Sequence, residues 1–203
     1  MLYSIAVLII SIFARVFFRL KVSGVENIPL SGGVIIAANH FSYLDIPLLS
    51  YGLNRPANFV GKKQLFTIPI VGTLLRLLGG IPIDREKIDR SALREIMKKL
   101  NSGNVVVIYP EGTRSHDGRL QPGKPGVGFI VRMSGKKVVP TAILGTDKAM
   151  PSGSWFIRPH PVTIRFGAPL DFSENPPKSE KQGVDSQITQ QIMDKIAALL
   201  DAG

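Results

Sequence analysis

The chain has 203 residues, of which 44% are hydrophobic and 20% are charged. This is the length of one domain, at most with an appendage, and the hydrophobic fraction is large enough for a substantial core, which excludes extensive disorder. The absence of cysteine excludes a disulfide scaffold, a thiolate metal site and a cysteine nucleophile. The three histidines, His40, His116 and His160, are too few for a multi-histidine metal cage, so we expect no bound metal.

Basic residues dominate the charge of this protein. Its 25 Lys and Arg residues exceed its 15 Asp and Glu residues, which gives a formal net charge of +10. Residues 171–203 carry a net charge of −3, so the first 170 residues carry +13. Such a region suits an anionic partner, whether nucleic acid, acidic lipid or a phosphorylated substrate, although surface cations also serve solubility alone.

The N-terminal segment is apolar. No charged side chain occurs before Arg15, and Arg19 and Lys21 follow it. As a helix, residues 1–20 would be about 30 Å long, close to the thickness of the hydrocarbon core of a bilayer. A secretory signal places its cations before the apolar run rather than after it. We therefore predict a membrane-anchoring helix at residues 1–20, half-inserted or spanning, with residues 21–203 on the cytoplasmic face of the inner membrane. A buried core helix and a signal are the alternatives.

Along the rest of the chain, short apolar runs alternate with stretches of helical periodicity. The apolar runs predict strands at residues 34–38, 58–61, 81–83, 105–109, 138–144 and 162–166. The periodicity predicts helices at residues 43–53, 70–78, 89–100, 129–133 and 187–200. This alternation is typical of an α/β fold, in which helices cover the faces of a sheet.

Three polar clusters directly follow predicted strands. Asn39 and His40 follow the first strand, Asp84 and Arg85 follow the strand at 81–83, and residues 111–115 follow the strand at 105–109. Ligands of open α/β sheets bind beyond the carboxyl ends of the strands. If these strands run in the same direction, the three clusters face one crevice.

The first cluster contains a candidate acid–base pair. His40 can accept a proton near neutral pH if a carboxylate orients its ring, and Asp45 is the nearby carboxylate. Five residues along one helix place two side chains about 140° apart, so the pair can meet only if His40 precedes the helix that contains Asp45. We expect His40 to be solvent-accessible. Alternatively, Asp45 is only an acidic residue in the first turn of a helix capped by Ser42.

The other two clusters contain candidate phosphate-binding residues. Arg114 offers a planar fork to phosphate, and Gly112 permits a close approach of the backbone. Lys63 and Arg85 can also bind phosphate, or they can belong to solvated turns. The spacing from Gly118 to Lys124 imitates a nucleotide-binding loop, but the next residue is proline instead of the Ser or Thr that binds magnesium, which excludes a nucleoside triphosphatase.

Four blocks together resemble the glycerolipid acyltransferase family. They are Asn39–His40 with Asp45, Gly80 to Arg85, Tyr109 to Ser115 and Val139 to Ala142, in that order. The Pro-Glu-Gly-Thr-Arg-Ser sequence in the third block is similar to the bacterial 1-acylglycerol-3-phosphate acyltransferases. The resemblance covers about residues 24–167. One departure is that Gln64 occupies the middle of a block that often reads Lys-Glu-Leu in the family.

The resemblance implies both a fold and a reaction. The fold would be a mixed, mostly parallel sheet flanked by helices, following an N-terminal apolar helix. The enzyme would transfer an acyl group from acyl-CoA or acyl carrier protein to the sn-2 hydroxyl of lysophosphatidic acid, giving phosphatidic acid. His40 would be the general base and Asp45 its orienting partner, without an acyl-enzyme, a metal or a cofactor. The implied substrate-binding residues are Lys63, Arg85, Glu111, Gly112, Thr113, Arg114 and Pro140.

Two other functions are compatible with parts of the sequence. A sibling enzyme that acylates glycerol-3-phosphate or another lysophospholipid would share His40 and Asp45. A basic membrane-surface protein that binds nucleic acid would explain the charge without His40. However, aromatic residues are only 7% of the chain and do not alternate with the lysines, so we expect membrane lipid, lysophospholipid and an acyl donor as partners, and no nucleic acid.

Overall fold

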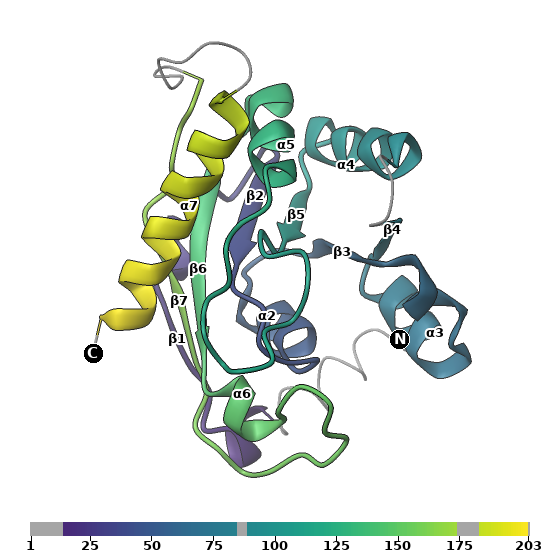
Figure 1. Ribbon diagram of the computed structural model, residues 1–203, viewed down its shortest axis with the longest axis vertical. Coiled ribbons are helices and arrows are strands. Elements are labelled where there is room, and N and C mark those ends of the chain that lie inside the picture. Colours follow the sequence, from purple (N-terminus) through teal and green to yellow (C-terminus); the bar gives the residue numbers. More distant parts are fainter. Residues whose placement is uncertain (1–13, 85–88, 174–182, 203) are drawn as a thin grey trace.

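The computed structural model describes residues 14–84, 89–173 and 183–202 (Figure 1). Within these residues, a seven-stranded sheet has the order β1-β7-β6-β2-β5-β3-β4. Its strands are β1 (Lys21–Ser23), β2 (Val34–Ala38), β3 (Ala57–Lys62), β4 (Ile81–Ile83), β5 (Val105–Ile108), β6 (Val138–Leu144) and β7 (Thr163–Phe166). Strands β2 to β6 run in the same direction, whereas β7 is antiparallel to β6 and pairs in parallel with β1. The predicted mixed, mostly parallel sheet is confirmed.

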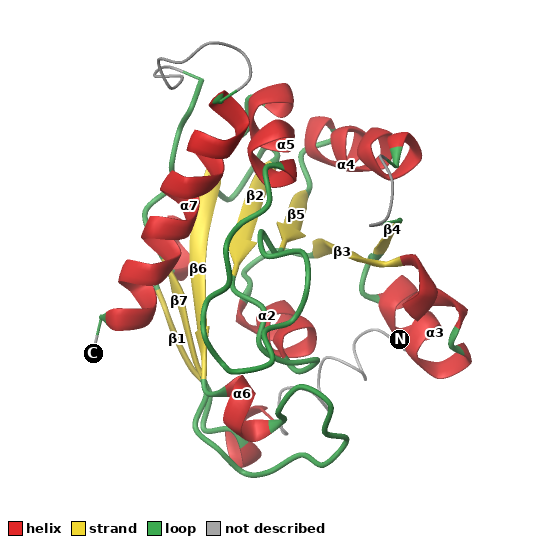
Figure 2. Ribbon diagram, in the orientation of Figure 1, coloured by secondary structure: helices red, strands yellow, loops and turns green. Residues whose placement is uncertain are grey.

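Helices cover both faces of the sheet (Figure 2). One face packs against α4 (Arg90–Asn101), α5 (Gly126–Ser134) and α7 (Val184–Asp201). The opposite face packs against α2 (Asp45–Gly52) and the buried side chains of Ala14 and Phe18. The remaining helical segments are η1 (Val25–Asn27), η2 (Lys63–Thr67), α3 (Pro69–Leu77) and α6 (Thr146–Ala149).

The central strand β2 shows why the apolar runs predicted buried strands. All five residues of Val34–Ala38 are fully buried, because parallel strands covered by helices on both faces carry apolar side chains toward each face. Ile36 packs in the core on the α2 side, and Ile35 packs in the core on the α7 side. Both cores therefore meet at the strand that leads directly to His40.

Several short elements were not predicted. The three residues of β1 are exposed, and a strand of this length leaves no periodic pattern. The helix predicted at residues 43–53 begins instead at Asp45, because residues 39–44 form a loop. The strand predicted at residues 105–109 ends at Ile108.

The N-terminal segment is described only from Ala14 onward. Residues 14–17 are helical, and the carbonyl oxygen of Phe18 accepts a hydrogen bond of 2.8 Å from the backbone N–H of Val162. Residues 14–18 are thus integrated into the domain. Residues 1–13 lie outside the described residues, so the anchoring helix at residues 1–20 stays a prediction. In the part of the chain that the structure describes, no helix is both long and apolar enough to cross a bilayer.

Candidate active site

The loops that follow β2 and β5 meet at one edge of the sheet. These strands are parallel neighbours, with Ala37 beside Ile108, so the residues that follow each strand lie close together. The backbone N–H of His40 donates a 2.7 Å hydrogen bond to Glu111 Oε1. The His40 ring stacks on Tyr109, with ring centroids 4.0 Å apart and an interplanar angle of 16°. The predicted convergence of the first and third clusters is therefore present.

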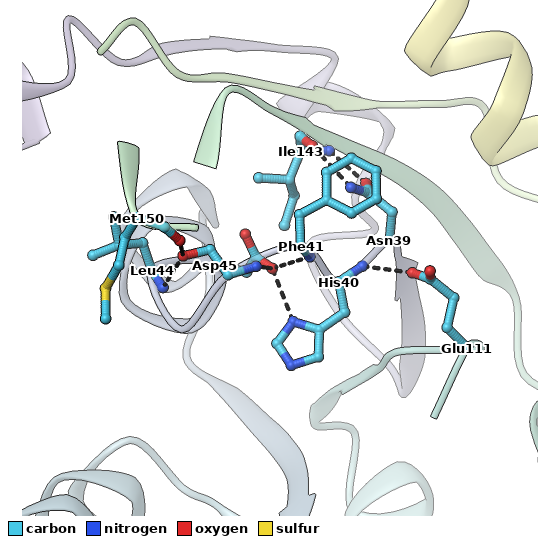
Figure 3. Close-up of polar contacts among 9 residues, drawn as sticks. Asn39, His40, Phe41, Leu44, Asp45, Glu111, Ile143 and Met150 are labelled. Atoms are coloured by element: carbon cyan, nitrogen blue, oxygen red, sulfur yellow. Dashed lines mark hydrogen bonds and ion pairs between the residues drawn. The ribbon is translucent and has the colours of Figure 1, made fainter. Parts of the chain in front are cut away.

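His40 and Asp45 form a hydrogen-bonded pair (Figure 3). His40 Nδ1 lies 2.8 Å from Asp45 Oδ2, with His40 in the loop and Asp45 at the first position of α2. The same Oδ2 accepts hydrogen bonds of 2.8 Å from the backbone N–H groups of Phe41 and Ser42. A carboxylate in this position places the imidazole proton on Nδ1, which leaves the lone pair of Nε2 for a substrate. The loop-and-helix arrangement that catalysis requires is thus confirmed, and Asp45 binds the N–H groups of the loop.

Two further polar side chains fix this loop, and the sequence analysis did not assign them these roles. The Asn39 side chain donates to the carbonyl oxygen of Ile143 at 2.8 Å and accepts from the N–H of Ile143 at 2.7 Å. The Ser42 hydroxyl donates to the carbonyl oxygen of Met150 at 2.7 Å. Both side chains are fully buried. Their signal in the sequence is the occurrence of small polar residues directly after a wholly apolar strand.

His40 is less accessible than expected from the sequence. Its exposed fraction is 7%, because the ring lies against Tyr109. Burial, together with the negative charge of Asp45, raises the pKa of the Tyr109 phenol well above its ordinary value, so this ring stays neutral. The His40 ring therefore packs against an uncharged aromatic ring.

Glu111 connects residues 39–45, here called the catalytic loop after the role expected of His40, to the loop that carries the basic residues. Its Oε1 accepts from His40, and its Oε2 accepts a 2.8 Å hydrogen bond from the backbone N–H of Gln121. The side chain is 1% exposed, and this burial raises its pKa to about 7 although both hydrogen bonds act in the opposite direction. Glu111 therefore contacts the backbone of His40, not its ring, and holds that backbone in position.

Gly112 and Arg114 shape the loop in front of the pair. Gly112 has φ of 71°, and a Cβ there would lie 3.0 Å from the Lys124 side chain, so glycine suits this position on both counts. The Arg114 guanidinium carbon lies 3.6 Å from the centre of the Tyr43 ring. Because Tyr43 belongs to the loop between His40 and Asp45, this contact brings a planar cation beside the pair. Thr113 is exposed in the same loop.

The remaining predicted residues have different positions. Lys63 is exposed at the start of η2, which follows β3 at the same edge of the sheet. Pro140 lies within β6, beside Ala37, and its ring is close to Gly167, next to α7. Ala37 faces the core on the α7 side, so the structure does not bring Pro140 beside the His40 ring. Arg85 lies outside the described residues.

A cavity of about 460 Å³ adjoins the catalytic loop at Phe41. Its lining combines apolar side chains such as Leu120 with two cations, Arg119 and Lys148, and two carboxylates, Asp147 and Asp201. The cavity also touches Leu144 at the carboxyl end of β6, so it opens at the edge of the sheet that carries His40. Among the described residues, no group of three or more His, Asp and Glu side chains is arranged to hold a metal ion.

Comparison with known proteins gives consistent matches. The family model described as Acyltransferase matches residues 19–144, a range that contains the pair and the Glu111–Arg114 loop. A 1-acyl-sn-glycerol-3-phosphate acyltransferase from Bacillus subtilis is 30% identical over 176 residues, which are 85% of each protein. A chloroplastic enzyme of the same name from Arabidopsis thaliana is 38% identical over 160 residues, which are 77% of this chain and 44% of that protein. This chain thus spans about half the length of the chloroplastic relatives that it matches.

The fold gives a match of its own. The crystal structure of the 1-acyl-sn-glycerophosphate acyltransferase PlsC from Thermotoga maritima superimposes with a TM-score of 0.78 at 30% identity. The alignment covers 99% of this chain and 80% of that one, so it includes the sheet, the flanking helices and the catalytic loop. The family model, the relatives and the fold agree, and the chain belongs to the acyltransferase family.

Proposed function

We propose that this protein transfers a fatty acyl group from acyl-CoA or acyl carrier protein to the sn-2 hydroxyl of 1-acylglycerol-3-phosphate, giving phosphatidic acid. The observation that carries the proposal is the 2.8 Å contact between His40 and Asp45, with Arg114 beside the same loop. The names of the relatives from Bacillus subtilis and Arabidopsis thaliana support the choice of acceptor.

The chemistry follows from the orientation of the imidazole. Nε2 of His40 takes the proton of the acceptor hydroxyl as its oxygen attacks the thioester carbonyl carbon. The new C–O bond forms, the C–S bond breaks, and the protonated imidazole returns its proton to the departing thiolate. Asp45 stabilises the imidazolium between these two steps. A thioester carbonyl is reactive enough to be attacked in this way, so the proposed reaction needs neither a metal nor a cofactor.

The basic residues at this edge explain the preference for a phosphorylated acceptor. Arg114 offers two parallel N–H donors to a phosphate, and Lys63 adds a point charge at the same edge of the sheet. Thr113 is exposed between Gly112 and Arg114, and its hydroxyl can donate to the same anion. Arg85 and Pro140 stay predictions as substrate-binding residues. The acceptor is a membrane lipid, so we also propose that the enzyme works at the cytoplasmic face of the inner membrane.

The test is a panel assay with the purified full chain. The donors are acyl-CoA and carrier protein loaded with an acyl group. Each donor is offered with 1-acylglycerol-3-phosphate, glycerol-3-phosphate, another lysophospholipid and a phosphate-free monoacylglycerol. Release of the free thiol is followed. We expect the fastest turnover with 1-acylglycerol-3-phosphate and no turnover in the His40→Ala variant. Faster turnover with glycerol-3-phosphate or another lysophospholipid would assign the sibling activity, and turnover without His40 would refute the mechanism.

A further inference from the structure

The strand order places the catalytic loops between two exposed apolar segments. His40 follows β2 and Glu111 follows β5, and these strands are neighbours in the order β6-β2-β5-β3. The outer strands of this set, β6 and β3, run in the same direction, so the segments that follow them emerge at the same edge. Figure 1 shows α3, which comes after β3, to the right of α2, and the loop after α6 below it.

The first segment is the exposed face of α3 with the residue before it, here called the α3 patch. It consists of Ile68, Ile70, Leu74 and Leu77, whose exposed fractions are 44%, 84%, 41% and 52%. Residues 70, 74 and 77 recur at helical spacing and share one side of the helix. The other side of α3 is already occupied, because Gly72 and Leu75 are buried against the protein. The α3 patch is therefore not needed to pack the helix against the residues that the structure describes.

The second segment is residues 155–157, here called the aromatic loop. Trp155, Phe156 and Ile157 are 76%, 79% and 41% exposed. The Trp155 ring stacks on Tyr43 with centroids 6.1 Å apart, and Tyr43 lies between His40 and Asp45 in the chain. The aromatic loop is thus connected directly to the catalytic loop. Exposed tryptophan is typical of the water–lipid boundary.

Both segments lie in stretches of the chain whose charged side chains are all cations. Residues 46–83, which include the α3 patch, contain no Asp or Glu but include exposed Lys62, Lys63 and Arg76. Residues 148–170, which include the aromatic loop, also contain no Asp or Glu, and both Lys148 and Arg158 are exposed. Apolar side chains that lie among cations are complementary to an anionic bilayer, which takes up the first and attracts the second. The nearest carboxylates in sequence, Asp84 and Asp147, lie directly outside these two stretches.

We propose that the α3 patch and the aromatic loop together dock this domain on an anionic lipid surface, with His40 held between the two points of insertion. This inference rests on the proposed function and deepens it, because it describes how a lipid-embedded acceptor reaches the base. The glycerophosphate headgroup lies at the level of the interface, where Arg114 contacts Tyr43, and only the acceptor hydroxyl has to approach Nε2.

The experiment uses probes at defined positions in the full chain. Because the chain contains no cysteine, Ile70→Cys provides a single site for an environment-sensitive dye, and Trp155, the only tryptophan, reports on the aromatic loop. Leu30→Cys is the matched control, since Leu30 is 82% exposed but precedes β2, at the opposite edge of the sheet. The lipid surface is supplied as vesicles of phosphatidylcholine with about 30 mol% phosphatidylglycerol, with and without a doxyl-labelled quencher lipid.

We expect blue shifts and quenching by doxyl lipid at Ile70→Cys and at Trp155, but not at Leu30→Cys. Affinity should fall about tenfold or more on pure phosphatidylcholine, because the cations then lose their partners. A response equal to that of Leu30→Cys would overturn the proposal, even if residues 1–13 keep the protein on the vesicles. A shift that grows with protein concentration without lipid would assign the patch to a second copy, and a shift only with acyl carrier protein would assign it to the donor.

Activity separates this inference from the proposed function. The same labelled proteins are assayed with a short-chain, water-soluble 1-acylglycerol-3-phosphate. Normal transfer with silent probes would leave the proposed function intact and refute the docking surface. Absence of transfer together with dye and Trp155 responses to lipid would support the docking surface and refute the proposed function.

Discussion

The catalytic loop and the residues expected to hold phosphate differ in how firmly they are fixed. In the catalytic loop, the side chains of Asn39, Ser42 and Asp45 are buried and hydrogen-bonded to the backbone, and Asp45 Oδ2 alone accepts three hydrogen bonds. Arg114 is half-exposed and lies on an aromatic ring, and Lys63 is exposed. The proposed base is therefore oriented before a substrate arrives, as efficient proton transfer requires, whereas the cations proposed to bind phosphate keep their solvation until the phosphate replaces it.

Removal of the proposed base should have the largest effect on the reaction. We expect His40→Ala to lower kcat roughly 10³-fold or more, because nothing else among the described residues occupies the position of Nε2. The truncation leaves a gap beside Tyr109 and so also costs some stability, and thermal unfolding must show that the variant is folded. His116→Ala is the control, because His116 is exposed and its described hydrogen bond is to Ser152. A folded His40→Ala enzyme within tenfold of the wild-type rate would contradict the assignment.

Asp45→Asn separates orientation from charge within the fixed loop. One carboxylate oxygen accepts all three hydrogen bonds, and the other, Oδ1, is buried with no partner among the described residues. The asparagine oxygen can therefore keep the loop and the ring in place, while the negative charge is lost. We expect kcat to fall roughly 10²-fold, with KM little changed, because general-base contributions are about 10²–10⁴ and orientation is preserved.

The buried amide NH₂ of that variant would cost about 1–3 kcal/mol of stability, which chemical denaturation would detect. If Asp45→Asn retains full kcat, the charge of Asp45 contributes nothing to the reaction, and its role is only to fix the loop. If KM rises while kcat is unchanged, Asp45 contributes to substrate binding instead of to proton transfer. The proposed difference between the catalytic loop and the phosphate-binding residues would then be wrong.

Arg114→Lys tests the loosely held region. Lysine keeps the charge but loses the planar fork and most of the contact with the Tyr43 ring. We expect KM for 1-acylglycerol-3-phosphate to rise about tenfold, with a much smaller effect on a phosphate-free acceptor, since a single bidentate contact to an anion contributes on this scale. Tyr43→Leu is the matched variant: it keeps Arg114 but removes the ring beneath it, together with the stacking on Trp155. Equal losses with both acceptors would make Arg114 a structural residue.

Glu111→Gln should have the smallest effect on the reaction. It tests how the catalytic loop is connected to the loop with the basic residues. An amide has one acceptor oxygen, so one of the two N–H groups now bound by Glu111 would lose its partner, at a cost of about 1–3 kcal/mol. The pKa of Glu111 is raised from its ordinary 4.5 to about 7, so its contribution to stability is fully present below pH 4.5 and is lost as the pH rises through 7. The gap in unfolding free energy between wild type and Glu111→Gln should therefore be larger at pH 5 than at pH 8. A gap independent of pH would show that Glu111 titrates normally.

The sequence predicted those parts of the molecule that leave a periodic or local signal. The apolar run before Asn39 predicted β2. The spacing of His40 and Asp45 allowed both the pair and a purely structural Asp45, and the resemblance to the acyltransferases favoured the pair. The stacking of His40 on Tyr109 was not predictable, because it depends on β2 and β5 being neighbours. The orientation of Pro140 was equally hidden, since it follows from its register beside Ala37, which no motif records.

Exposure was the least predictable property. His40 was expected to be accessible, but Tyr109 covers one face of its ring. The sequence analysis assigned no position to Trp155, and the fold leaves it 76% exposed. In both cases the outcome depends on a partner that is distant in sequence, which local patterns do not contain.

The two hydrogen bonds between the Asn39 side chain and the backbone of Ile143 make this residue an extension of the sheet. A primary amide presents the same donor and acceptor as a peptide group, so the β2–β6 pairing continues although the main chain has already turned toward His40. The amide proton of Ile143 is consequently shielded by a side chain of the catalytic loop. The rate at which this proton exchanges with deuterium therefore reports whether the catalytic loop is correctly aligned. This single amide can be followed in the absence of any substrate.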